Sequence, residues 1–136
     1  MPSNLRYPDE SCQRLHMPDR DRTDPSLFLD DIVVAIDRIL LFTSGMTRND
    51  FGNDLKTQDA VIRNLEILGE AVKNLPETFK EMYPEVPWAH MAAMRDKLIH
   101  HYFGVSLDIT WVTITEDIPG IRPVLLEIRE KMKGPA

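Results

Sequence analysis

Apolar residues recur every three or four positions along most of the chain, and this helical period limits the fold more than any other feature. No segment shows the convincing alternation of apolar and polar residues that is typical of a strand. Asp24 can cap the first helix, and Pro25 suits its first position. The apolar stripe of this helix consists of Leu29, Ile32, Val33, Ile36, Ile39 and Leu40. The periodicity therefore predicts an all-α chain.

A second long helix is expected after a polar loop through Gly45, Asn49 and Gly52. Its apolar stripe consists of Val61, Leu65, Leu68, Val72 and Leu75. Pro76 marks its end, because proline cannot donate the hydrogen bond that would continue the helix.

The third long helix should follow a short helical turn at 77–82 and the extended segment YPEVP. We expect it to run from Pro87 to Phe103. Gly104 is well placed as its left-handed terminator.

The last helix should begin after Ser106, with Pro119 and Pro123 kinking it. Its apolar stripe consists of Leu107, Trp111, Ile114, Ile118, Ile121, Leu125, Ile128 and Met132. Short connections between long amphipathic helices favour antiparallel neighbours. We therefore predict an antiparallel bundle of four to five helices with a kinked last helix.

The length of 136 residues suits one domain, which we place at residues 24–134. Residues 1–23 are rich in Pro, Arg, Asp and Ser and are predicted to form a mobile extension. Cys12 is the only cysteine, and no apolar run is long enough for a signal peptide or a membrane span, so a cytoplasmic protein is expected. The net charge of −6 argues against a broad basic surface for nucleic acid, although it allows a local basic cleft.

An arginine interrupts the apolar stripe of the third helix, which otherwise contains Trp88, Met91, Leu98 and Tyr102. A guanidinium stays protonated at any relevant pH, so burying it is costly unless a carboxylate pairs with it. Arg95 could reach solvent at the rim of the helix. It could also form a salt bridge with Asp96, or with Glu66 or Glu70 of the second helix. Arg95 is therefore expected to be paired or to line a wet cleft.

Asp96 and His100 are four residues apart, so they share a helix face and can hydrogen-bond. Arg95 and His100, however, lie about 140° apart around an ideal helix. One helix cannot easily direct both at the same small group of atoms, but two copies packed about a two-fold axis can. The spacing therefore predicts a homodimer with a composite site.

The segment RDKLIHHY, residues 95–102, resembles the signature of the HEPN ribonucleases, in which Arg and a polar residue precede His; here these are Arg95, Asp96 and His100. The HepT-like branch adds a tyrosine two positions after the histidine, which Tyr102 matches. The segments DAVIRNLEILGEAVKNLP, VPWAHMAAMRDKLIHHYFGV and LDITWVTITEDIPGI are also similar to this branch. The resemblance covers residues 26 to about 130 and implies a HEPN-like bundle.

What the resemblance implies is the toxin of a type VII toxin-antitoxin pair. Such a toxin is a metal-independent endoribonuclease that cleaves cellular RNA through attack of the ribose 2′-hydroxyl, with tRNA and mRNA both candidates. His100 would be the general acid/base, Arg95 would bind the scissile phosphate, and Asp96 would orient or tune the pair. A minimal nucleotidyltransferase antitoxin would add AMP to Tyr102. We expect no cofactor, and neither DNA nor a membrane as a partner.

Two positions depart from the branch. Asp96 stands where asparagine is most common, and His101, which could assist catalysis, stands where a small residue is usual. Because a carboxylate lowers the positive potential that RNA needs, a second interpretation stays open. It is a catalytically weak or inactive HEPN module that docks a nucleotidyltransferase partner or a nucleotide.

Two residues of the second helix are candidates for supporting the site. Gly69 is expected to permit close approach of another helix, and Glu70 could reach Arg95 as its buried partner. No pair of His, Cys and carboxylates shows a convincing metal-ligand spacing, so no metal site is predicted.

Overall fold

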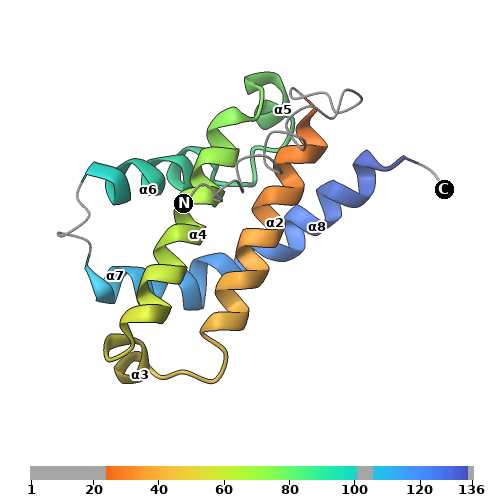
Figure 1. Cartoon of the computed structure of the whole chain (residues 1–136). Helices are drawn as coiled ribbons and strands as arrows, with labels where there is room; N and C mark the ends of the chain where they lie inside the picture. The colour runs from red at the N-terminus through yellow and green to blue at the C-terminus, as the bar shows by residue number, and fades with distance from the viewer. Residues whose placement is uncertain (1–23, 101–105, 135–136) are drawn as a thin grey trace, which may run out of the picture.

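The computed structural model describes residues 24–100 and 106–134, and the side chains of residues 98–100 lie outside its description. All regular structure within these ranges is helical, so the predicted all-α bundle is confirmed (Figure 1). The predicted extension at residues 1–23 lies outside the described residues. None of the described helices is long and apolar enough to cross a bilayer.

Two long antiparallel helices, α2 (Pro25–Phe42) and α4 (Leu55–Asn74), form the centre of the bundle (Figure 1). As predicted, Asp24 caps α2 by accepting a hydrogen bond from the amide of Ser26 at 3.0 Å. Both predicted stripes are confirmed, since they point into the core. The fully inaccessible side chains of α2 and α4 are Leu29, Ile32, Ile36, Ile39, Val61 and Val72.

The expected polar loop between these helices is wrong in part, because it contains the short helix α3 (Arg48–Gly52). Thr47 and Asp50 form a capping box, in which each side chain accepts a hydrogen bond from the other's backbone amide at 3.0 Å. Phe51 is completely buried and anchors α3 to the core. The cap and this single aromatic residue thus fold a segment whose composition is typical of a loop.

The expected turn at 77–82 is confirmed as α5 (Glu77–Met82). The third long helix, α6 (Trp88–His100), begins one residue after the predicted Pro87 and packs on α4. Its predicted end at Phe103 and its predicted terminator Gly104 lie outside the described residues.

The C-terminal helical run has three parts, α7 (Leu107–Val112), a π-helical segment η2 (Thr113–Asp117) and α8 (Ile118–Met132). The π-helical segment ends two residues before Pro119, which has no amide hydrogen to donate to a carbonyl one turn back. The predicted apolar stripe is buried or half-buried throughout, and α8 packs on α2. Two ion pairs link α8 to α2, Arg122 with Asp37 at 2.7 Å and Arg129 with Asp30 at 3.5 Å.

Candidate active site

The site is built where α6 crosses α4 at Gly69. A Cβ atom placed on Gly69 would lie 2.2 Å from the Cβ of Arg95 and 3.1 Å from the backbone oxygen of Met91. The predicted role of Gly69 in close helix approach is therefore confirmed. Since Met91 is buried against the core, this contact fixes the position of the backbone from which Arg95 extends.

Arg95 is bound by two carboxylates, one from each helix. Its Nη2 atom lies 3.0 Å from Oε1 of Glu70, and its Nη1 atom donates to Oδ1 of Asp96 at 3.2 Å. Of the partners considered from the sequence, Glu70 and Asp96 are used, whereas Glu66 pairs with Arg63 at 3.8 Å. The side chain of Arg95 is 26% exposed, so the guanidinium is paired and also reaches the surface.

The expectation that Glu70 is a buried partner is wrong in one respect, because its side chain is 51% exposed. Glu70 lies on the solvent side of the α4–α6 contact, where its carboxylate keeps much of its hydration. Pairing a surface carboxylate with a half-buried guanidinium avoids the larger cost of desolvating both ions.

Lys73, which was not predicted from the sequence as a site residue, completes the charged cluster. Its Nζ atom lies 3.0 Å from Oδ1 of Asp96, the same oxygen that Arg95 contacts. Hydrogen bonds from Lys73, and next from Arg95, hold the pKa of Asp96 below its usual value of 3.8. Lys73 is one helical turn after Gly69, and that offset could have identified it as facing α6. Two cations and two anions thus meet here with no net formal charge.

The structure brings Arg95, Asp96 and Glu70 together but covers the remaining predicted residues only in part. His100 is the last residue of α6, one turn beyond Asp96, and its side chain lies outside the description. His101 and Tyr102 lie outside the described residues. The composite site with a second copy therefore stays a prediction.

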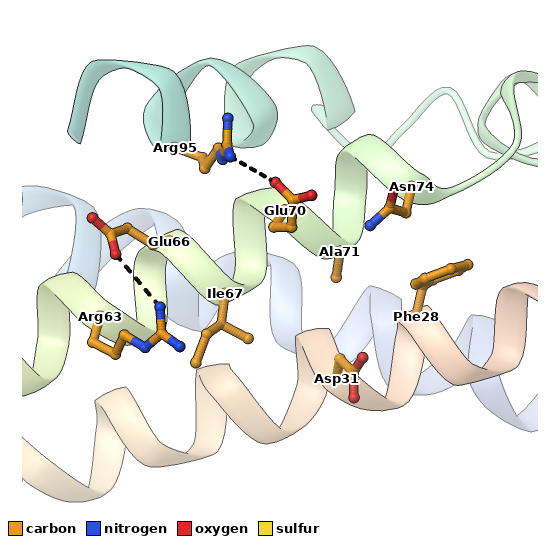
Figure 2. Close-up of a pocket in the computed structure, with 9 residues that line it drawn as sticks. All are labelled: Phe28, Asp31, Arg63, Glu66, Ile67, Glu70, Ala71, Asn74 and Arg95. Atoms are coloured by element: carbon orange, nitrogen blue, oxygen red, sulfur yellow. Dashed lines mark ion pairs between the residues drawn. The ribbon is translucent and has the colours of Figure 1, made fainter. Parts of the chain in front are cut away.

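A groove of about 300 Å³ opens beside Arg95 along the junction of α2 and α4 (Figure 2). Its walls include Phe28 from α2 and Ile67, Ala71 and Asn74 from α4. In Figure 2 the guanidinium of Arg95 lies above α4, on the α6 side of these residues. This groove was not predicted from the sequence, in which neither Phe28 nor Asn74 was singled out.

The described residues contain no group of three or more His, Cys, Asp or Glu side chains that could hold a metal ion. What the cluster does offer is a guanidinium with five donors, held in a fixed orientation and partly open to solvent. A planar donor fork of this kind suits a phosphate group better than a point charge does.

Comparison with known proteins agrees with this geometry. The family model described as "Ribonuclease HepT-like" matches residues 32–128. The chain is 52% identical over 103 residues to a "Probable ribonuclease HepT" from Thermococcus cleftensis, which covers 76% of this chain and 94% of that protein. It is 48% identical over 113 residues to "Putative RNase MJ0127" from Methanocaldococcus jannaschii, which covers 83% of this chain and 93% of that protein. No solved structure gives a significant match. Because the family model matches residues 32–128 and these relatives match most of the chain, the chain belongs to the HepT-like ribonuclease family.

Proposed function

We propose that this protein is a metal-independent endoribonuclease toxin that cleaves cellular RNA at a site shared between two copies of the chain. The observation that carries the proposal is the partly exposed side chain of Arg95, fixed by Glu70 and Asp96, in a chain of this family. The relatives named as ribonucleases support RNA as the substrate.

In the proposed reaction Arg95 binds the two non-bridging oxygens of the scissile phosphate. An imidazole of His100 removes the proton of the ribose 2′-hydroxyl, and the 2′-oxygen then attacks phosphorus. The bond from phosphorus to the 5′-oxygen breaks, and that oxygen takes a proton from a second acid. The products are a 2′,3′-cyclic phosphate and a 5′-hydroxyl. Arg95 contributes most where negative charge builds up on the pentacoordinate phosphorus group.

The second copy supplies what one chain cannot. Arg95 and His100 diverge by about 140° around α6, so a phosphate held by Arg95 of one chain is better reached by His100 of a partner. A two-fold dimer also provides two imidazoles in one cleft, one to accept a proton and one to donate it. Asp96 supports this arrangement, because its position one turn before His100 allows it to orient the imidazole.

A nucleotidyltransferase antitoxin would silence the enzyme by transferring AMP to the hydroxyl of Tyr102. The transfer forms a phosphodiester between the tyrosine oxygen and the α-phosphate of ATP and releases pyrophosphate. The added nucleotide places a negative charge and a bulky group two residues from His100, where it would repel the RNA phosphate.

The test is cleavage of total cellular RNA by the purified chain in the presence of a chelator. Wild-type protein should produce fragments with 2′,3′-cyclic phosphate ends, whereas His100→Ala and Arg95→Gln should not. His90→Ala is the matched control, because His90 is an exposed histidine on the same helix. Equal cleavage by wild type and His100→Ala would refute the proposed site.

One observation favours the second interpretation, a docking module with weak activity or none. Glu70 and Asp96 contact both Nη atoms of Arg95, and the four charges of the cluster cancel. A neutral cluster attracts RNA less strongly than a free arginine would. Such a module would bind a nucleotidyltransferase or a nucleotide equally well with His100→Ala, and neither form would arrest growth on expression.

A further inference from the structure

The groove beside Arg95 is large enough to hold one nucleobase. Its volume of about 300 Å³ is at the lower end of the range of roughly 300–1,000 Å³ that is usual for small-molecule sites. A single base with part of its ribose suits such a space, whereas a base pair or a folded RNA element does not.

The apolar part of the lining can receive the face of a base. Phe28 forms one wall, and Ile67 and Ala71 of α4 point toward α2 (Figure 2). Phe28 is only partly buried, so its ring packs against the core and also keeps accessible surface. Stacking of a base on an aromatic ring is a common contribution to the binding of single-stranded RNA, and it tolerates any base.

The charges that line the groove indicate which end suits the phosphate and which end suits the base. Three carboxylates (Asp31, Glu66, Glu70) and two arginines (Arg63, Arg95) line it, so its formal charge is −1. A second phosphate inside the groove would be repelled, whereas an uncharged base would not. Arg95 is less exposed than Arg63, at 26% against 72%, and two carboxylates fix it. The phosphate therefore belongs at the Arg95 end, with the base extending toward Phe28.

The polar groups of the groove favour a base that donates hydrogen bonds. Asn74 presents an exposed amide beside Phe28, whose oxygen accepts and whose nitrogen donates, and the carboxylate of Glu66, which pairs with Arg63 at 3.8 Å, keeps acceptor capacity on a side chain that is 25% exposed. The amino groups of adenine, cytosine and guanine can donate to such acceptors. Uracil has no amino group, and its single N3–H donor lies between two carbonyl oxygens, which the carboxylates would repel.

We propose that this groove binds the base of the nucleotide adjacent to the scissile phosphate, and that it prefers amino-bearing bases to uracil. The proposal rests on the proposed function, because it takes Arg95 as the phosphate-binding group. It adds a substrate preference, and it assigns Phe28 and Asn74 as specificity-determining residues.

The first experiment measures binding without catalysis. The probes are the 3′- and 5′-monophosphates of guanosine, adenosine, cytidine and uridine, titrated into the full chain by isothermal calorimetry. In at least one of the two series, the uridine nucleotide should bind about 2- to 10-fold more weakly than the others, which corresponds to one net hydrogen bond. Phe28→Leu keeps apolar volume but removes the aromatic face, and it should weaken binding of all four bases roughly 5-fold or more.

Two matched variants control for general effects. Phe42→Leu alters a partly exposed phenylalanine at the opposite end of α2, and Asn49→Ala alters an exposed asparagine on α3. Both should bind the nucleotides as wild type does, whereas Asn74→Ala should reduce the preference over uridine. Thermal unfolding of each variant verifies that the fold is retained.

The second experiment maps the cleaved linkages of a long RNA by sequencing the ends. Wild type should disfavour uridine on one side of the cut, and Asn74→Ala should relax that bias. Unchanged cleavage maps and unchanged nucleotide affinity in both Phe28→Leu and Asn74→Ala would overturn the subsite while leaving the ribonuclease in place. Nucleotide binding that depends on Phe28 in a protein that cleaves no RNA would instead support the subsite and refute the enzyme. Groove variants that change only the mass of the assembly would identify the occupant as a second copy and overturn the proposal.

Discussion

Oε1 of Glu70 lies 3.0 Å from Nη2 of Arg95, and this ion pair joins α4 to α6 one residue beyond Gly69. A side chain as long as arginine has many rotamers, and a carboxylate on a neighbouring helix selects among them. Glu70 is therefore a positioning residue for the proposed reaction, acting on the scissile phosphate only through Arg95.

Replacing Glu70 should lower activity through misplacement of Arg95. In Glu70→Ala the second-order rate of RNA cleavage should fall roughly 10- to 100-fold, which is the range expected for a small displacement of a group that contacts the reacting phosphate. Glu70→Gln should recover most of this loss, because its amide oxygen still accepts from Arg95. Glu77→Ala, which removes a glutamate paired with Lys80 at 3.0 Å, should behave as wild type. Equal loss in the alanine and glutamine variants would contradict a positioning role.

Gly69→Ala should destabilise the fold although alanine is the better helix former. The new methyl group would overlap the Cβ of Arg95, which is close to the backbone and cannot swing away. Overpacking of this kind typically costs about 1–3 kcal/mol of unfolding free energy, against a helix-propensity gain of about 1 kcal/mol. Urea unfolding measures the difference. Gly120→Ala in α8 is the control, since its methyl group would meet no atom within 4 Å and should be neutral or stabilising.

Lys73 should control the titration of Asp96. The pKa of Asp96 is lowered first by its hydrogen bond to Lys73, so Lys73→Gln should raise that pKa toward 3.8. A lowered pKa in the folded state stabilises the fold above the ordinary value, and this contribution is lost as the pH falls through the lowered value. Wild type should therefore lose more stability on acidification below about pH 4 than Asp96→Asn does. Carboxyl chemical shifts followed by NMR give the pKa directly, and an unchanged value in Lys73→Gln would contradict the assignment.

The fold was largely predictable from the sequence, because the periodic stripes of α2, α4 and α8 carry the core and Asp24 and Pro25 mark the start of α2. The short helix α3 was missed, since its five residues are too few to show a period and depend on the burial of Phe51. Within the site, Arg95 was identifiable as a charge on an apolar seam. Which glutamate pairs with Arg95 could not be predicted, because Glu66 and Glu70 lie in the same region of α4. The crossing of α6 over α4 at Gly69 determines that Glu70 is the partner.

The groove could not be predicted for a related reason. Phe28 and Asn74 are 46 positions apart in sequence, and only the antiparallel packing of α2 on α4 brings them to one surface. A partly exposed phenylalanine within an amphipathic helix is ordinary, so nothing in its local pattern marked it.

The proposed dimer predicts that activity depends on protein concentration. One chain has a mass of 15.7 kDa, so sedimentation should give about twice that value at concentrations where RNA is cleaved. Dilution below the dimer dissociation constant should lower the activity per chain, because Arg95 of one copy then lacks His100 of the other. Constant activity per chain in a sample that sediments as a monomer would contradict the composite site.

The proposed antitoxin predicts a specific change in mass. Co-expression with a minimal nucleotidyltransferase should add one or more AMP units to the chain, detected by intact mass spectrometry, and should abolish cleavage. Tyr102→Phe should keep the unmodified mass and stay toxic in the presence of the antitoxin. Tyr83→Phe is the control, since Tyr83 lies before α6 and should not affect the added mass. Addition of AMP to Tyr102→Phe would place the modification elsewhere.

The π-helical segment between α7 and α8 determines how insertions and deletions can be tolerated in this fold. Trp111, two residues before it, packs against Phe51 of α3, whereas Arg122 and Arg129, after it, pair with carboxylates of α2. Loss of one residue from Thr113–Asp117 would turn everything downstream by about 100° about the helix axis. Both arginines would then leave their carboxylates while Trp111 kept its partner. The π-helical turn thus sets the rotation of α8 about its axis relative to α7. A residue should be gained or lost there only if the contacts between α8 and α2 change as well.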